Sequence, residues 1–178
     1  MKNIAVAGKA LTLIFAAVFL VACSSNDTKE ADEAAAAAAA AAQAAEQAAA
    51  SEQQAAASEQ AAEVQRLQDA VATVGNVFYF EYDSSMLTPS AKASVDAHIA
   101  LLNTNERTIR LEGHTDERGT RDYNMALGER RANAVRDYMA ASGVANYRVE
   151  SVSYGEEQPI AYGSGESNWS QNRRVELK

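Results

Sequence analysis

The chain has 178 residues, a formal net charge of −8 and a single cysteine, Cys23. One cysteine excludes an intramolecular disulfide framework, and the acidic balance excludes binding of nucleic acid through a basic surface. Residues 1–74 carry 4 basic and 9 acidic groups, and residues 75–178 carry 12 and 15. Neither part therefore has the positive charge that a nucleic-acid partner requires.

Residues 1–22 have the features of an export signal. Lys2 and Lys9 give a basic start, and the apolar run over 10–21 that follows is too short for a membrane span. Cys23 comes directly after this run, and it has no disulfide partner and no metal-ligand spacing. The sequence therefore predicts a signal peptide over 1–22 and a special use for Cys23.

The order Leu20-Val21-Ala22-Cys23 resembles the lipobox of bacterial lipoproteins. The resemblance implies that Cys23 is acylated, with palmitate among its acyl chains, and becomes the first residue of the mature chain. Ser24, where an aspartate would favour the inner membrane, implies sorting to the periplasmic face of the outer membrane. One acyl chain binds a bilayer only marginally, so a stable lipid anchor requires two or more. The alternative is an ordinary secretory signal with an incidental cysteine.

Residues 23–75 are expected to form a tether. Of the 29 residues from 34 to 62, 19 are alanine and the others are glutamine, glutamate and serine. Such a segment cannot build a core, but its composition favours a helix. An apolar stripe of Val64, Leu67, Val71 and Val74 follows, at the spacing of a helix, and docking on the folded domain is favoured over self-association.

Residues 76–178 are expected to fold as one α/β domain. The order of elements is β-α-β-α-β-β, which indicates a mixed sheet with two helices on one face. Right-handed crossovers make the first three strands parallel, and the last pair is expected to be antiparallel across a long loop over 155–171. The expected strands are 77–82, 108–112, 149–154 and 174–178, and the expected helices are 89–102, which Thr88 caps, and 122–142, which Gly143 ends.

The apolar face of the second helix contains two polar residues, Asn124 and Arg131. Arg130 projects from another face and is expected in solvent, whereas Arg131 falls inside the apolar cluster. Because an arginine is almost never enclosed without a partner, Arg131 requires one. The apolar members of this face are Leu127, Ala132, Ala134, Val135, Tyr138 and Met139.

Asp116, in the loop before this helix, is the nearest acid, and two interpretations are open. In the first, Asp116 and Arg131 form an internal salt bridge. In the second, they bind a ligand that carries both charges, such as an ammonium and a carboxylate on one carbon. The loop 113–120 leaves the carboxyl end of a strand and enters a helix, a place where ligands and anions commonly bind. The planar fork of Arg131 suits a carboxylate.

His114, Thr115 and Asn124 complete the expected ligand-binding set. A metal site or an acid/base group over Glu112 to Glu117 is the weaker interpretation, because the chain has two histidines and a catalytic zinc site draws on three protein ligands. We therefore expect no metal, no cofactor and no catalysis.

Ordered motifs run through the domain: DERGT at 116–120, YN at 123–124, LGERRANAV at 127–135, SYGEEQP at 153–159 and NRR at 172–174. With them, residues 77–178 resemble the OmpA-like peptidoglycan-binding domain family, and most closely its branch in the Tol-Pal system. In that family the matching aspartate and arginine bind the zwitterionic end of meso-diaminopimelate in the peptidoglycan stem peptide. The resemblance implies this role for Asp116 and Arg131.

The resemblance further implies a non-catalytic lipoprotein that tethers the outer membrane to the cell wall and supports envelope integrity and constriction at cell division. Its expected partners are peptidoglycan, TolB with other Tol proteins, and outer-membrane lipid through acylated Cys23. Two alternatives stay open: an OmpA-domain envelope spacer outside the Tol system, and a periplasmic cell-wall hydrolase. The alanine-dense tether departs from the mixed polar linkers expected in such proteins.

Overall fold

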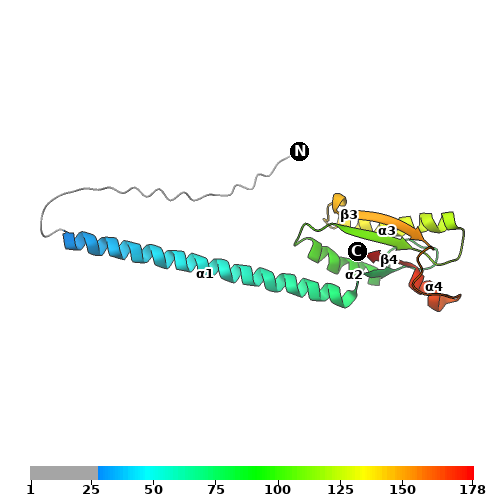
Figure 1. Ribbon diagram of the computed structural model, residues 1–178, viewed down its shortest axis with the longest axis horizontal. Helices are drawn as coiled ribbons and strands as arrows, with labels where there is room; N and C mark the ends of the chain where they lie inside the picture. Colours follow the sequence, from blue (N-terminus) through cyan, green and yellow to red (C-terminus); the bar gives the residue numbers. More distant parts are fainter. Residues whose placement is uncertain (1–27) are drawn as a thin grey trace. The chain divides into compact units, whose positions relative to one another are not determined.

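The structure is a computed structural model that describes residues 28–178, so the expected signal peptide and Cys23 lie outside the described residues. By the contacts between its residues the chain forms two compact units, and the second begins at Gln53. Helix α1 (Thr28–Val74; Figure 1) agrees with the helix expected of the tether, and all residues from 32 to 63 are exposed. No helix among the described residues is both long and apolar enough to cross a membrane.

The last turns of α1 meet the folded part of the chain. Val71 lines a cavity of about 240 Å³ together with Leu101 and Ile109, which places one residue of the expected stripe against the domain. The carbonyl oxygen of Gly75 lies 2.9 Å from Nε2 of His98, and His98 is buried. Burial lowers the pKa of His98, although this hydrogen bond opposes the shift.

The folded part alternates strands and helices, as the sequence predicts, with two short helices in addition. Thr88 caps the second helix, because its side chain accepts a hydrogen bond from the backbone of Ala91, and Pro89 opens it. The elements are β1 (Val77–Tyr79), α2 (Pro89–Leu102), β2 (Ile109–His114), α3 (Arg121–Ala141), a 3₁₀ turn (Asn146–Arg148), β3 (Val149–Gly155), α4 (Glu166–Asn172) and β4 (Arg174–Leu177).

The four strands form one mixed sheet in the order β1-β4-β2-β3. Strand β4 runs antiparallel to both β1 and β2, and β2 runs parallel to β3, so the first three strands share one direction, as expected. The last two strands run in opposite directions, as expected, but they are not neighbours, because β4 does not pair with β3. It inserts between β1 and β2, where Val175 becomes fully buried beside Phe78 and Gly113.

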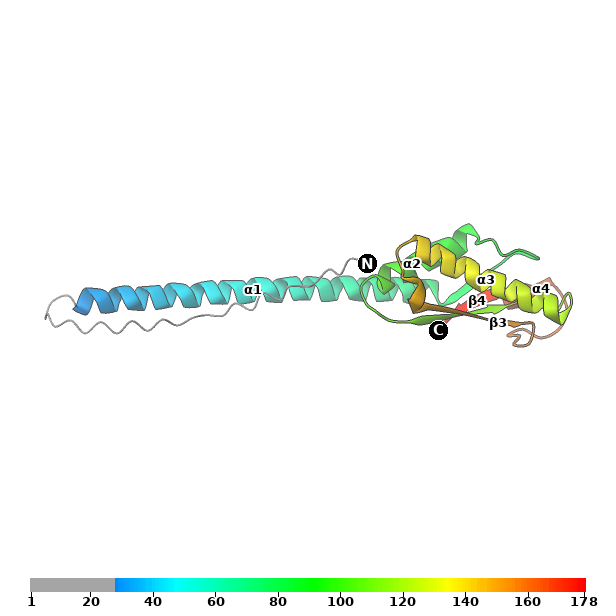
Figure 2. The same ribbon diagram turned by 90° about the horizontal axis from the view of Figure 1, so that it is seen from above.

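Helices α2 and α3 lie on the same side of the sheet, above the strands in Figure 2. The hydrophobic core fills the space between these two layers. One expectation is corrected in the segment 155–171, which was expected to be a loop and contains most of α4. The core residues include Phe78, Phe80, Val95, Ile99, Leu111, Ala132, Val135, Met139, Val149 and Val175.

Helix α3 approaches β2 backbone to backbone. A Cβ atom built on Gly113 would lie 2.0 Å from the carbonyl oxygen of Gly128, and one built on Gly128 would lie 2.4 Å from Oγ of Ser153. Only glycine permits such an approach. This contact fixes α3 against the end of β2, and both elements carry residues of the candidate site.

Candidate functional site

The start of α3 is fixed by a cap that positions Arg131. Oγ1 of Thr120 accepts a hydrogen bond from the backbone of Tyr123, and the helix then turns Asn124 and Arg131 toward the sheet. The exposed fraction of Arg131 is 0 %, so the burial expected from the helical periodicity is confirmed. Arg130 is exposed, also as expected.

The guanidinium of Arg131 binds three backbone carbonyls. Nε donates to the carbonyl oxygen of Ser84 at 2.8 Å, Nη1 to that of His114 at 2.9 Å and Nη2 to that of Glu81 at 3.1 Å. These bonds tie the turn before α2 and the end of β2 to α3. Burial lowers the pKa of Arg131 to about 10, against the opposing charge of Asp116, so Arg131 remains a cation at neutral pH.

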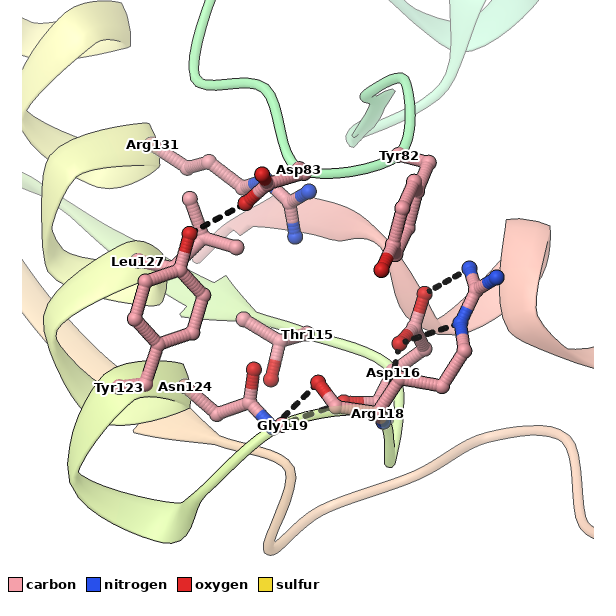
Figure 3. A pocket seen from close by; sticks show the side chains of 10 residues that line it. All are labelled: Tyr82, Asp83, Thr115, Asp116, Arg118, Gly119, Tyr123, Asn124, Leu127 and Arg131. Carbon is pink, nitrogen blue, oxygen red and sulfur yellow. Dashed lines mark hydrogen bonds and ion pairs between the residues drawn. The ribbon is translucent and has the colours of Figure 1, made fainter.

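Arg131 and Asp116 line the same cavity, which has a volume of about 130 Å³. Figure 3 shows Arg131 entering from α3 and Asp116 from the loop after β2, on different sides of this cavity. No ion pair of residues 28–178 joins them, so the internal salt bridge is not formed. The other lining residues are Tyr82, Asp83, Thr115, Arg118, Gly119, Tyr123, Asn124 and Leu127.

The carboxylate of Asp116 is held by two other arginines. Nε and Nη2 of Arg118 donate to its two oxygens at 3.1 and 2.7 Å, the backbone N–H of Arg118 adds a third bond at 3.1 Å, and Nη1 of Arg173 lies 3.4 Å from Oδ2. Burial would raise the pKa of Asp116, but the hydrogen bonds and charge of Arg118, with Arg173, lower it overall. Asp116 is therefore an anion that already has cationic partners.

Arg118 is held in place by two aromatic rings. Its guanidinium carbon lies 3.9 Å from the ring centre of Tyr82 and 4.1 Å from that of Trp169, within the range of cation–π attraction. Trp169 belongs to α4, so this helix contributes to the site from a segment that the sequence analysis treated as loop. Arg173, which follows α4, bonds to Phe80 and Glu166 as well as to Asp116.

Asp83 is a second carboxylate of the cavity, and no motif in the sequence marks it. Its φ of 50° is in the left-handed region, where aspartate is one of the few residues other than glycine that are found often. Its carboxylate accepts a hydrogen bond from the hydroxyl of Tyr123 but makes no ion pair among residues 28–178. Figure 3 shows the Asp83–Tyr123 bond beside Arg131.

The remaining expected site residues have different positions. Thr115 and Asn124 line the cavity, and the amide of Asn124 donates to the carbonyl oxygens of Asp116 and Arg118 and to Glu156. His114 does not line the cavity. Its ring stacks on Tyr154, with ring centres 5.6 Å apart, and it serves the site only through its backbone carbonyl.

Six residues of the cavity lining lie outside the expected ligand-binding set, and four of them, Tyr82, Asp83, Arg118 and Tyr123, carry polar side chains. Tyr82 and Asp83 belong to a turn that is distant in sequence from the 113–131 segment. The hydrogen bonds from Arg131 to the carbonyls of Ser84 and Glu81 hold that turn at the cavity. Arg118 and Tyr123 lie within the segment, but the sequence gives no reason to expect either side chain anywhere but in solvent. The signal that was available is the DERGT motif itself, which sets Arg118 two positions after Asp116. No group of three or more histidine, cysteine or acidic side chains that could bind a metal was found among the described residues.

The chain was compared with known proteins. Residues 79–173 match the model described as the OmpA family. The chain is 54 % identical over 111 residues to a peptidoglycan-associated lipoprotein of Pseudomonas putida, an alignment covering 62 % of this chain and 67 % of that protein. It is 58 % identical over 101 residues to one of Pseudomonas aeruginosa, covering 57 % of this chain and 60 % of the relative.

Among solved structures, the fold is similar to the peptidoglycan-associated lipoprotein from Burkholderia pseudomallei. The TM-score is 0.57 at 41 % sequence identity, and the match covers 58 % of this chain and 88 % of that structure. The alignments to the two Pseudomonas proteins leave about a third or more of each relative uncovered. The similarity to the OmpA family model is therefore a similarity of the folded domain, over residues 79–173.

Proposed function

The chain belongs to the OmpA family, and on that premise we propose that it is an outer-membrane lipoprotein that binds peptidoglycan non-covalently. Proteins named peptidoglycan-associated lipoprotein are its relatives at 54 and 58 % identity, which supports both parts of the proposal. The anchor would be acylated Cys23, which lies outside the described residues. In this scheme residues 1–22 are the signal peptide, 23–75 the lipidated tether and 76–178 the binding domain.

The ligand of the cavity is the zwitterionic end of meso-diaminopimelate in the stem peptide. The observation that carries this proposal is the enclosed positive charge of Arg131, which is bound to three neutral carbonyls and to no carboxylate of residues 28–178. A buried cation that no carboxylate contacts is costly, and a ligand carboxylate would supply that contact.

The ammonium of the ligand would be received by the carboxylates of the cavity. Asp83 has one oxygen bonded to Tyr123 and no cationic partner among residues 28–178, so it can bind an ammonium directly. Asp116 can do so only in competition with Arg118, which occupies both of its oxygens. The ligand site would thus consist of Arg131 for the carboxylate and of Asp83 with Asp116 for the ammonium, with Asn124 holding the loop.

The protein would act as a tether and not as an enzyme. The two carboxylates of the cavity lining are engaged by other side chains, Asp116 by the guanidinium of Arg118 and Asp83 by the hydroxyl of Tyr123, and neither is paired with a serine, cysteine or histidine of the lining. A cell-wall hydrolase predicts muropeptides released from purified peptidoglycan, with loss of that release on chelation if a metal is involved. Unchanged peptidoglycan after prolonged incubation supports the tether.

The deciding experiment is a titration of the purified protein with two stem peptides. In N-acetyl-L-Ala-γ-D-Glu-meso-diaminopimelate the side-chain carbon that bears the ammonium also bears a carboxylate. The lysine-containing analogue has the ammonium but lacks this side-chain carboxylate. A charged partner of this kind is commonly worth on the order of 2 to 5 kcal/mol, so the lysine peptide should bind roughly thirtyfold more weakly or worse. Equal affinities would contradict the role given to Arg131.

The place in the Tol-Pal system is tested separately. If the protein acts there, TolB copurifies with it from the envelope, and the protein supports constriction of the outer membrane at cell division. If TolB is absent while peptidoglycan binding is intact, the protein is an envelope spacer outside the Tol system. The peptide titration is independent of this result.

A further inference from the structure

A second cavity, of about 200 Å³, lies next to the ligand cavity and shares Thr115 with it. It has a glutamate from each of two loops: Glu117, from the loop after β2, and Glu156, from the loop after β3. We call it the acidic cavity.

Neither glutamate makes an ion pair within residues 28–178. Oε1 of Glu117 accepts hydrogen bonds from Ser164 at 3.0 Å and from the indole of Trp169 at 3.1 Å, and Oε2 of Glu156 accepts one from Asn124. The second oxygen of each carboxylate receives no hydrogen bond from a described residue. Two negative charges therefore line one cavity, and the donors that bind them are neutral.

Thr115 supplies an independent sign of a missing ligand. Its exposed fraction is 3 %, and its hydroxyl has no hydrogen-bond partner in the described structure. Buried hydroxyl groups are nearly always hydrogen-bonded, so an orphaned one in the wall of a cavity points to a group that enters it. A hydroxyl beside two carboxylates can accept a hydrogen bond from an ammonium or a guanidinium.

We propose that the acidic cavity binds the cationic end of a lysine or arginine side chain of a protein partner. The apolar lining of Pro159 and Ala161 suits the methylene groups of a long basic side chain. Two large residues of the same loop are exposed, Ile160 at 51 % and Tyr162 at 81 %, and Tyr162 itself lines the cavity. Exposed apolar side chains around a charged pocket are typical of a protein interface.

Peptidoglycan is not a suitable occupant of the acidic cavity. In the stem peptide the ammonium of diaminopimelate is the one free amine, and the other ionisable groups are carboxylates that two glutamates would repel. The inference therefore concerns a partner other than the ligand of the first cavity, and this exclusion rests on the proposed function, which assigns that ammonium to Asp83 and Asp116.

The test uses the full chain, labelled with ¹⁵N, and Nα-acetyl-L-lysine methylamide as the probe, followed by the amide signals of Thr115, Ala161 and Gly163. We expect saturable shifts in the range up to about 50 mM, and none with the norleucine analogue, which has the methylenes without the charge. Shifts of equal size with norleucine, or none with the lysine probe, would overturn the proposal.

Variants locate the probe. Glu117→Gln and Glu156→Gln should each weaken its binding by about fivefold or more, while Glu157→Gln removes the same charge one position away and should change it by less than about twofold. Glu157 is exposed, does not line the cavity and pairs with Arg121. Equal effects of all three would show general attraction to an acidic protein and refute the site. Displacement of the probe by the diaminopimelate peptide would place it in the first cavity and refute it equally.

Discussion

The guanidinium of Arg118 binds the carboxylate of Asp116 through two parallel hydrogen bonds, of 3.1 Å from Nε and 2.7 Å from Nη2. Such a bidentate pair is among the stronger polar contacts in proteins. Here it neutralises the acid that the sequence pairs with Arg131. The cavity of this structure is thus lined by one cation, Arg131, and one anion, Asp83, that form no ion pair within residues 28–178.

Replacement of the Arg118 guanidinium by the neutral amide of glutamine should free Asp116 for the ligand. In Arg118→Gln we expect the diaminopimelate peptide to bind about threefold to tenfold more tightly, because its ammonium no longer competes with a guanidinium. The pKa of Asp116 should rise toward its ordinary value, because the hydrogen bonds of Arg118 that lower it are gone. Calorimetry gives the affinity, and NMR titration gives the pKa.

The fluorescence of Trp169 can report the release of Asp116 by Arg118 when the peptide binds. Trp169 is the only tryptophan, and its ring lies against Arg118. Its fluorescence should change when the wild-type protein binds the peptide and Arg118 leaves Asp116. The Arg118→Gln variant should show a smaller change. Weaker binding by the variant would contradict the competition and show instead that Arg118 binds the ligand.

Replacement of Arg131 by lysine should reduce both stability and binding. Lysine keeps the charge but lacks the planar fork that reaches the carbonyls of Ser84, His114 and Glu81. We expect a loss of about 2 to 4 kcal/mol in the free energy of unfolding and at least tenfold weaker peptide binding. Urea unfolding and calorimetry measure the two effects.

Arg130→Lys is the matched control, because Arg130 is the exposed neighbour of Arg131 in α3. It should change the free energy of unfolding by less than about 0.5 kcal/mol. Equal losses in the two variants would mean that the buried bonds of Arg131 contribute little.

Protonation of His114 should destabilise the protein in mild acid. Its exposed fraction is 1 %, both ring nitrogens lack a hydrogen-bond partner in the described structure, and burial, with the positive charge of Arg174, lowers its pKa from 6.5 to about 4. The unfolded chain therefore binds a proton between pH 6.5 and 4 that the folded chain does not. Stability falls as the pH falls through this window, by up to about 3 kcal/mol.

The measurement is urea unfolding at several pH values in the wild type and in His114→Phe, which keeps a ring against Tyr154 without a titrating group. The wild type should lose stability relative to the variant as the pH falls from 6.5 to 4. Parallel pH profiles would show that His114 does not carry the acid sensitivity. His98, whose pKa is also lowered by burial, contributes equally to both proteins and leaves the difference unaffected.

The glycine contact between β2 and α3 should tolerate no side chain at position 113. In Gly113→Ala the new Cβ meets the backbone carbonyl of Gly128, so α3 must move or the protein must unfold. We expect a loss of about 3 kcal/mol or more, with loss of peptide binding, since α3 carries Arg131. Thermal unfolding and the peptide titration measure both.

Gly128→Ala gives the comparison, because its nearest obstacle is the Oγ atom of Ser153 and not a backbone atom. It should cost less than Gly113→Ala, and the added change Ser153→Ala should recover part of the loss. If Gly113→Ala is as stable as the wild type, the close approach of the two elements does not determine the position of α3.

The fold class and the burial of Arg131 could be predicted from the sequence because both depend on periodicity. The spacing of apolar residues along 122–142 sets which side chains face the sheet, whatever that sheet contains, and Asn124 and Arg131 are buried as this spacing requires. The cap of α2 at Thr88 is equally local and agrees with the prediction.

The contacts that give the cavity its charge were decided by tertiary structure alone. The insertion of β4 between β1 and β2, the hydrogen bond from Trp169 of α4 to Glu117 and the binding of Arg118 by Tyr82 and Trp169 all join segments that are distant in the chain. Local spacing cannot rank such partners, because a carboxylate binds whichever guanidinium the folded backbone brings within reach. The sequence by itself determined that Arg131 would be enclosed, whereas the packing of the 81–84 turn and the end of β2 against α3 decided that backbone carbonyls, and not Asp116, would hold it.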